Sequence, residues 1–196
     1  SNVILKNQFK NYDDLSKIYL DFRRKINSLK KKSFVVAVSG GPDSLALTAL
    51  TRALYYETNK KFYYVLINHN IRKDSKQEAN KVKLLLKKNG LNLNILSNYS
   101  KIEKNIQSQA RTIRYNLLKN FCKKKKIDTI LTAHNLEDQV ETFFIRLSRG
   151  SGVTGLSAMD NLSYLNGKIR LCRPLLDVRK KTLIKISKSI FKKYIK

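Results

Sequence analysis

The sequence predicts an α/β domain of three layers, in which a mostly parallel, twisted sheet carries helices on both faces. Strand-like runs alternate with stretches of helical periodicity along the chain. Most of these runs are nearly solid in β-branched and aromatic residues, as is typical of parallel strands that are buried on both faces. At 196 residues, the chain is long enough for one core of this kind.

The first element is an amphipathic helix. Its apolar residues recur at intervals of three and four, with lysines on the opposite side. They are Leu15, Ile18, Tyr19, Phe22, Ile26 and Leu29. We interpret residues 1–32 as an N-terminal segment built around this helix.

Strands and helices then alternate. The predicted strands are 34–38, 62–68, 91–96 and 128–133. The predicted helices are 43–56, 75–89 with Gly90 just after its end, 106–124, and one from about 135 to about 149. Right-handed crossovers would place the carboxyl ends of the strands along one edge, where ligands bind in such sheets. We interpret residues 33–178 as the main domain.

The C-terminal part is less regular. A segment rich in Gly and Ser begins at Gly150, and the following run predicts a short hairpin that turns at Asn166-Gly167. Residues 179–196 predict a basic helix, which we interpret as the start of a truncated or missing helical portion.

The charge balance favours a polyanionic partner. Lys and Arg number 41 against 14 Asp and Glu, which gives a net charge of +27. Nucleic acid is the expected partner. A compositional bias toward Lys, which outnumbers Arg 30 to 11, is the alternative, but it does not require Asp and Glu to be scarce.

The cysteines and the hydropathy pattern exclude several classes. Cys122 and Cys172 stand fifty residues apart and neither belongs to a CxxC motif, so no zinc or iron–sulfur site is predicted. No stretch approaches the roughly 20 apolar residues of a membrane helix. We expect a cytoplasmic protein with reduced thiols and no membrane contact.

The stretch SGGPDS, residues 39–44, directly follows the first predicted strand. Gly40 and Gly41 permit close approach of a ligand to backbone N–H groups, and Ser39 and Ser44 offer hydroxyls to phosphate oxygens. A helix that begins immediately afterwards adds a partial positive charge. This pattern predicts a phosphate site, although it is neither a Walker P-loop nor a GxGxxG fingerprint.

Asp43 is the unexpected member of this stretch, because a carboxylate repels phosphate unless a cation lies between them. The functional interpretation is a Mg²⁺ ligand. The alternative is helix capping, since Pro42, Asp43 and Ser44 before a helical run are good capping residues without any ligand.

A second group of candidates lies at 131–144, in LTAHNLEDQVETFF. His134 ends a predicted strand, and Asp138 and Glu141 follow at four and seven residues, a spacing that predicts one shared helix face. Two carboxylates on that face suit a cation, either Mg²⁺ or an ammonium group. First-turn acids that complement the helix dipole are the alternative, which explains Glu141 poorly.

Basic residues extend the set. Arg111, Arg114 and Tyr115 stand at three and four on a predicted helix and suit a phosphate, or else form a solvated face. His69 and Arg72 follow the second long strand, where a nucleotide would lie, although His69 fits a partly buried bystander equally well.

Another pair, Arg146 and Arg149, precedes the Gly-rich segment. This pair suits a mobile substrate loop or, alternatively, an ordinary helix C-terminus with favourable cations.

Together these motifs resemble a known family. SGGPDS looks like the PP-loop of N-type ATP pyrophosphatases, which cleave ATP between its α and β phosphates. NHNIR, QARTIRY, TAHNLEDQVET, RGSGVTGLSAM and RPLLDVRK occur in the order and approximate spacing of the tRNA(Ile)-lysidine synthases. The resemblance covers residues 33–183 and implies an adenine nucleotide alpha hydrolase-like fold.

The resemblance also implies a reaction. The family adenylates C2 of wobble cytidine 34 in tRNA(Ile) with a CAU anticodon, then replaces AMP with free L-lysine. ATP and Mg²⁺ are the implied cofactors. The ATP-binding residues would be Ser39, Gly40, Gly41, Pro42, Asp43, Ser44, His69 and Arg72. The metal ligands would be Asp43 and Asp138, and catalysis would involve Asp43, Asp138, Glu141 and Arg114. Lysine and the substrate nucleotide would meet His134, Asp138, Glu141 and Arg149.

Two departures and several alternatives accompany this resemblance. Asn70 stands where the family often has glycine, which a left-handed backbone tolerates. Family members continue past the RPLL segment, whereas this sequence stops at Lys196. The alternatives are a tRNA cytidine 2-thiolase of the PP-loop class, for which paired cysteines are missing, and a noncatalytic module that binds ATP or RNA. NAD and GMP synthetases would leave the net charge of +27 unexplained.

Overall fold

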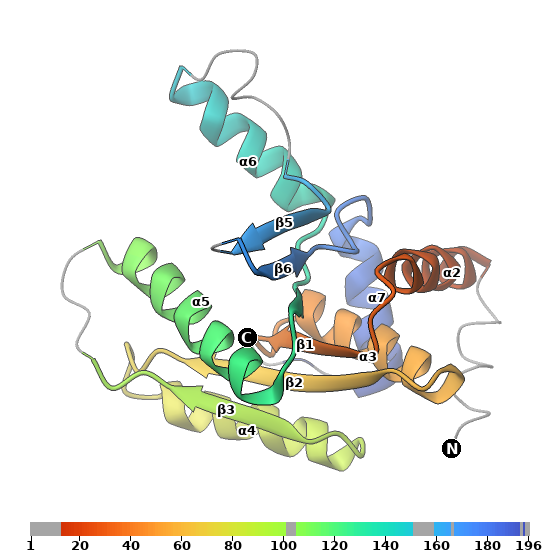
Figure 1. Ribbon diagram of the computed structural model, residues 1–196, viewed down its shortest axis with the longest axis horizontal. Helices are drawn as coiled ribbons and strands as arrows, with labels where there is room; N and C mark the ends of the chain where they lie inside the picture. Colours follow the sequence, from red (N-terminus) through yellow and green to blue (C-terminus); the bar gives the residue numbers. More distant parts are fainter. Residues whose placement is uncertain (1–12, 101–104, 151–158, 166, 193, 195–196) are drawn as a thin grey trace.

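The computed structural model describes residues 13–100, 105–150, 159–165, 167–192 and 194. Its centre is a six-stranded sheet with the order β3-β2-β1-β4-β6-β5 (Figure 1). The strands are β1 (Ser33–Val38), β2 (Lys61–Asn68), β3 (Leu93–Ser97), β4 (Thr129–Leu131), β5 (Leu162–Leu165) and β6 (Ile169–Cys172). The pairings from β3 to β6 are parallel, and β5 pairs with β6 antiparallel. The predicted mostly parallel sheet is therefore confirmed.

Helices cover both faces of the sheet, which confirms the three layers. The helices are α2 (Asp13–Ser28), α3 (Pro42–Glu57), α4 (Ser75–Lys88), α5 (Ile106–Lys125), α6 (Leu136–Ser148) and α7 (Lys180–Phe191). Side chains of α2, α3, α4 and α7 form one core cluster with one face of the sheet, whereas α5 packs in a second cluster on the other face. The sheet thus separates two apolar layers.

Alternation along the strands explains how one sheet supplies two cores. In β1, Phe34 and Val36 belong to the cluster with α3, whereas Val35 belongs to the cluster with α5. Successive side chains of a strand point to opposite faces, so a strand buried on both sides must be apolar at nearly every position. The solid apolar run at 34–38 is the consequence.

The two flanking helices share the larger core with the middle of the chain. Phe22 and Ile26 of α2 and Leu183 and Ile186 of α7 are all buried in that cluster. The helix predicted over 179–196 ends at Phe191. The division of the chain at residues 32 and 178 stays a prediction, since all these helices pack around the same sheet.

Some element boundaries differ from those predicted. β4 spans only three residues and ends at Leu131, so the strand predicted over 128–133 was too long. The predicted hairpin appears as the antiparallel β5–β6 pair. Asn166 of its turn lies outside the described residues, and Gly167 has a φ of +74°. In the described part of the chain, we find no helix long and apolar enough to cross a membrane.

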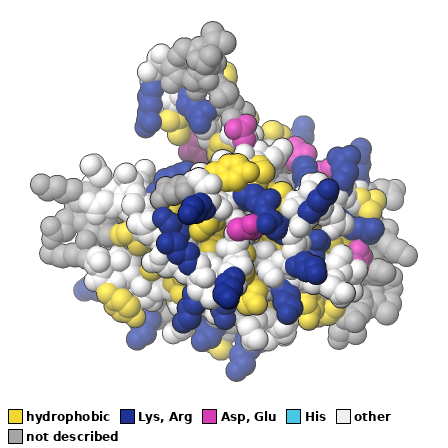
Figure 2. Space-filling view, viewed as in Figure 1, with side chains coloured by type: hydrophobic (Ala, Val, Ile, Leu, Met, Phe, Trp, Pro, Cys, Tyr) yellow, Lys and Arg dark blue, Asp and Glu magenta, His cyan; other side chains and the backbone are white. Residues whose placement is uncertain are grey.

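Helix α6 stands apart from the layers. It projects away from the sheet (Figure 1), and none of its residues is buried. Phe143 and Phe144 are 39% and 60% exposed. Over the rest of the surface seen in Figure 2, Lys and Arg side chains are spread widely and Asp and Glu are sparse.

Candidate functional site

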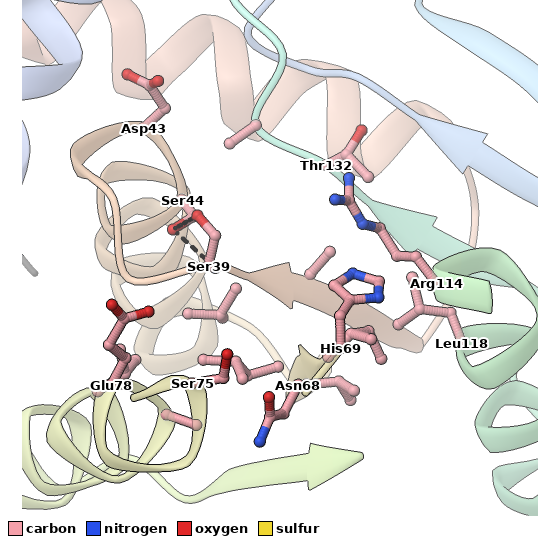
Figure 3. A pocket seen from close by; sticks show the side chains of 18 of the residues that line it. Ser39, Asp43, Ser44, Asn68, His69, Ser75, Glu78, Arg114, Leu118 and Thr132 are labelled. Atoms are coloured by element: carbon pink, nitrogen blue, oxygen red, sulfur yellow. Dashed lines mark hydrogen bonds between the residues drawn. The ribbon is translucent and has the colours of Figure 1, made fainter. Parts of the chain in front are cut away.

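The segment 39–44 forms a tight turn between β1 and α3. Gly40 has a φ of +89°, which a residue with a side chain adopts only with strain. The Ser44 Oγ accepts hydrogen bonds from the backbone N–H groups of Ser39 (3.1 Å) and Gly40 (3.2 Å). It also lies 3.1 Å from the Ser39 Oγ and donates to the Gly41 carbonyl at 3.0 Å (Figure 3). Donors of this turn therefore converge on one oxygen at the start of a helix, an arrangement suited to an anion.

Asp43 lies in the first turn of α3 but does not cap it. Gly41 occupies the N-cap position, and no side chain makes a cap hydrogen bond there. Pro42 occupies the first helical position, where its missing N–H costs nothing. Of the two interpretations of Asp43, capping is therefore not what the structure shows.

The Asp43 carboxylate has one oxygen that no donor from the described residues satisfies. Its Oδ1 is buried and has no hydrogen-bond partner among the described residues. Burial raises its pKa; the charge of Lys180 opposes this shift, and Asp138 and Glu137 add to it. A buried carboxylate oxygen without a donor is costly unless a cation or a donor arrives.

A cavity of about 480 Å³ opens beside the turn, at the carboxyl ends of the parallel strands. This volume lies in the range of small-molecule sites. The predicted site residues that line it are Ser39, Asp43, Ser44, His69, Arg72, Arg114 and His134. In Figure 3, His69 and Arg114 face the turn from the other side of the cavity. Segments far apart in the sequence thus meet at one site.

Both histidines of the chain line this cavity. The Nδ1 of His69 is buried without a hydrogen-bond partner in the described structure, and burial and Arg114 lower its pKa. The Nδ1 of His134 lies 2.9 Å from the Thr132 Oγ1, and burial lowers its pKa, with Arg173 as the next contributor. Both imidazoles are therefore neutral near pH 7 and able to accept a proton.

The arginines differ in how they are held. The Arg72 guanidinium lies at the cavity mouth and donates to the Glu78 carboxylate at 3.1 Å. Arg111 stacks over the Tyr115 ring, 5.3 Å from its centroid. Of the predicted cluster on α5, Arg114 and Tyr115 line the cavity, whereas Arg111 does not.

The acidic pair on α6 is placed differently from the prediction. Asp138 closes a capping box: the Asn135 N–H donates to its Oδ2 at 2.9 Å, and its own N–H donates to the Asn135 Oδ1 at 3.1 Å. The helix therefore begins at Leu136, and the expectation that His134 shares a helix face with Asp138 and Glu141 was wrong. Glu141 is exposed, and neither carboxylate lines the cavity.

Arg149 is not brought to the cavity. It forms the C-cap of α6, at the end of the helix farthest from the sheet (Figure 1), and it is exposed. Residues 151–158 of the motif that follows lie outside the described residues.

Three residues of this region were not singled out from the sequence. Asn135 is fully buried, and its pattern of Asn followed by Asp at the third position is a recognisable capping signal. Arg173 is buried, donates to the Ser163 Oγ at 3.0 Å, and carries a charge that lowers the pKa of His134. Asn68 ends β2 and accepts from the N–H of Asn70, whose φ of +52° confirms the left-handed backbone expected there.

Neither of the two cysteines lines the cavity. Cys122 and Cys172 are both buried, in different core clusters. Burial raises the pKa of Cys122 to about 12 and that of Cys172 to about 11. Across the described residues, no three His, Cys, Asp or Glu side chains group closely enough to hold a metal alone.

Comparisons with known proteins agree with this geometry. The PP-loop domain family matches residues 14–196. A tRNA(Ile)-lysidine synthase of Wolbachia pipientis wMel is 40% identical over 172 residues, which cover 85% of this chain and 40% of that protein. The synthase of Orientia tsutsugamushi (strain Boryong) is 40% identical over 151 residues, covering 76% and 34% respectively. This chain therefore spans about two fifths or less of the length of these relatives.

Solved structures share the fold. The U34-tRNA thiolase NcsA from Methanococcus maripaludis, with its [4Fe-4S] cluster, superposes with a TM-score of 0.75 at 18% identity, over 92% of this chain and 65% of that one. The NH3-dependent NAD synthetase from Campylobacter jejuni superposes with a TM-score of 0.52 at 18% identity, over 88% and 70%. At such identities the likeness extends to the fold alone.

Proposed function

This chain belongs to the PP-loop domain family, and from that premise we propose that it catalyses the ATP-dependent modification of a tRNA as a tRNA(Ile)-lysidine synthase. In the proposed reaction, the C2 carbonyl oxygen of wobble cytidine 34 in a CAU anticodon attacks the α phosphate of ATP and releases diphosphate, which leaves AMP attached at C2. Free L-lysine then displaces AMP, and the products are lysidine, AMP and diphosphate. The observation that carries this proposal is the shared cavity, in which the glycine turn, both histidines and Arg114 meet.

The turn is the proposed phosphate site of ATP. The backbone N–H groups of Ser39 and Gly40 already converge on one oxygen, that of Ser44, and the N-terminus of α3 adds a positive field. The cavity beside it has room for a nucleotide. His69 and Arg72, farther along its wall, are proposed to contact the remainder of ATP.

Asp43 fits the Mg²⁺ that this family implies, because its Oδ1 is buried without a partner among the described residues. Asp138 is the proposed second ligand. Its negative charge raises the pKa of Asp43, and only its Oδ2 accepts a hydrogen bond in the capping box, which leaves its Oδ1 for the ion. When bound, the ion would neutralise phosphate charge and polarise the α phosphate.

The other side of the cavity is proposed to serve cytidine and lysine. Arg114 would stabilise the negative charge on the phosphate of the AMP group that is attached to the cytidine. The lysine amine must lose a proton before it attacks, and the neutral imidazole of His134 is able to receive that proton. Glu141 and Arg149 are exposed on α6, so we assign them to the tRNA and lysine side of the reaction.

The net charge of +27 supports tRNA as the partner. Because tRNA, ATP and free lysine occur together in the cytoplasm, that is the proposed location. The thiolase alternative has less support, since its sulfur chemistry needs accessible thiolates and both cysteines are buried with raised pKa values.

The deciding experiment measures AMP release from labelled ATP with a CAU-anticodon tRNA transcript, with and without free lysine. The Wolbachia relative serves as a positive control, and a transcript with another anticodon as a negative one. We expect lysine to become attached to the CAU transcript, with one AMP released per lysine.

Other outcomes would point elsewhere. Adenylated tRNA that accepts sulfide but not lysine would favour the thiolase. Binding of ATP and tRNA without AMP release would favour the noncatalytic module.

A further inference from the structure

Asn135 is a fully buried polar residue, and the amide nitrogen of its side chain has no hydrogen-bond partner in the described structure. Its side chain is 0% exposed, and its Oδ1 accepts the Asp138 N–H at 3.1 Å. Its Nδ2 is also buried but has no hydrogen-bond partner among the described residues. Leaving such a donor unpaired costs free energy, so it needs an explanation beyond capping.

The capping role does not use this donor. A cap needs only a side-chain oxygen, and Asp and Ser supply one about as well as Asn. At this position the backbone is held twice, because the Asn135 N–H donates to Asp138 and the Leu136 N–H donates to the Val178 carbonyl at 3.1 Å. The Nδ2 group is therefore rigidly placed.

The neighbour of this donor is the Asp43 carboxylate. The Asn135 side chain is close enough to act on Asp43 as a hydrogen-bond donor, which lowers the pKa of Asp43, although the two groups do not meet the geometry of a formed hydrogen bond. The Oδ1 of Asp43 is the second buried group of this region without a partner in the described structure. A carboxylate turns easily about its last side-chain bond, and such a rotation changes which of its oxygens faces the Asn135 donor.

We propose that Asn135 is a positioning residue whose Nδ2 donates to one oxygen of Asp43 when ATP binds, leaving the other oxygen aimed at the cation on the phosphates. The inference rests on the proposed ATP site. On this proposal, Asn135 at the N-terminus of α6 has two roles: it caps the helix, and it orients the Asp43 carboxylate beside the proposed phosphate site.

The test measures binding of α,β-methylene ATP by calorimetry, in Mg²⁺ and in EDTA. Asn135→Ser keeps an oxygen for the cap but removes the donor, and Asn135→Asp keeps the shape of the side chain but replaces the donor with a charged oxygen. We expect the Kd in Mg²⁺ to rise about tenfold for the Ser variant and further for the Asp variant. In EDTA we expect little change for Asn135→Ser, because Asn135 acts through the cation site.

Asn89→Ser is the matched control. It also removes an Nδ2 hydrogen bond, from Asn89 to the Leu85 carbonyl, but at the end of α4. Its Kd should equal that of the wild type, and thermal unfolding will confirm that each variant is folded. A Ser variant that binds like the wild type in Mg²⁺, or that loses affinity equally in EDTA, would overturn the inference. Failure of the wild-type protein to bind the analogue would instead refute the proposed function.

Discussion

At the scale of single residues, the site contains a carboxylate whose burial costs free energy. The Asp43 carboxylate is half-buried with an unpaired oxygen, and its pKa is raised mainly by burial, with Asp138 and Glu137 adding to the shift. The fold thus disfavours the ionised form of this carboxyl group. Such an unsatisfied group is typical of a functional site where a ligand supplies the missing partner, which in our proposal is the cation on the phosphates of ATP.

Asp43→Asn should therefore separate stability from activity. A carboxyl group with a raised pKa in the folded state contributes stability below its unfolded pKa, and this contribution is lost as the pH rises through the folded pKa. The Asn variant should be more stable than the wild type at pH 7.5 in urea unfolding, and the difference should shrink toward pH 4. AMP formation should fall by about a hundredfold or more. Undiminished AMP formation would remove Asp43 from the reaction.

His134 should make the fold sensitive to mild acid. Its folded pKa is lowered, mainly by burial, so its contribution to stability is full above the unfolded pKa of about 6.5 and is lost as the pH falls toward the folded pKa. His134→Gln should flatten the fall in unfolding free energy between pH 7.5 and 5. The measurement is urea unfolding across that range, and parallel curves for variant and wild type would contradict the expectation.

At the scale of elements, the sequence predicted most helices and strands, because their signals are local. Gly90 was expected just beyond α4 and has a φ of +71° there, and α4 ends within one residue of the prediction. β4 was predicted too long, since apolar residues alone do not reveal where the chain leaves the sheet toward the cap at Asn135. The local sequence indicates the capping box of Asn135 and Asp138, but it does not indicate which residues from distant parts of the chain lie next to that cap.

The same limit applies to the candidate site. The turn at 39–44 was predicted from its glycines and serines, and it opens into the cavity as expected. Arg149 carried an equally good motif but lies at the far end of α6. The difference arises because a helix that projects from the sheet carries its end away from the cavity, and the direction of a helix is set by packing rather than by local sequence.

Contacts between the starts of two helices illustrate what only the structure shows. The backbone N–H of Lys180, at the first position of α7, donates to the Glu137 Oε2 at 2.8 Å, across 43 residues of sequence. No cap hydrogen bond comes from the side chain at the N-cap position, Arg179. Glu137 therefore caps α7 from α6 and ties the C-terminal helix to the region of Asp43.

Glu137→Ala should lower the free energy of unfolding by about 1 kcal/mol, as the loss of an N-cap does. Glu137→Gln keeps an acceptor oxygen and should lose less. Glu141→Ala, on the same helix but exposed, is the control for the general effect of removing an acid from α6. Urea unfolding at pH 7.5 measures all three, and equal losses for Glu137→Ala and Glu141→Ala would mean that the cap contributes nothing.

At the scale of the whole molecule, the positive surface and the cavity are expected to play different roles in binding. The net charge of +27 is spread over the surface, as the face in Figure 2 shows, whereas the cavity combines a few cations with Asp43 and Glu78. A distributed positive surface attracts any nucleic acid phosphate, irrespective of sequence. For the proposed tRNA partner, we therefore expect discrimination to come from the cavity and its rim, and affinity from the surface.

This separation predicts how binding responds to salt. The affinity for a CAU-anticodon tRNA should fall steeply from 50 to 200 mM salt, with a slope of log K against log salt of about −0.9 per phosphate contacted. A tRNA with another anticodon should show nearly the same slope, because the electrostatic contribution does not depend on sequence, but a lower affinity at every salt concentration. Filter binding across four salt concentrations measures both. A flat response would contradict nucleic acid as the partner, and equal affinities for the two tRNAs would place discrimination outside this chain.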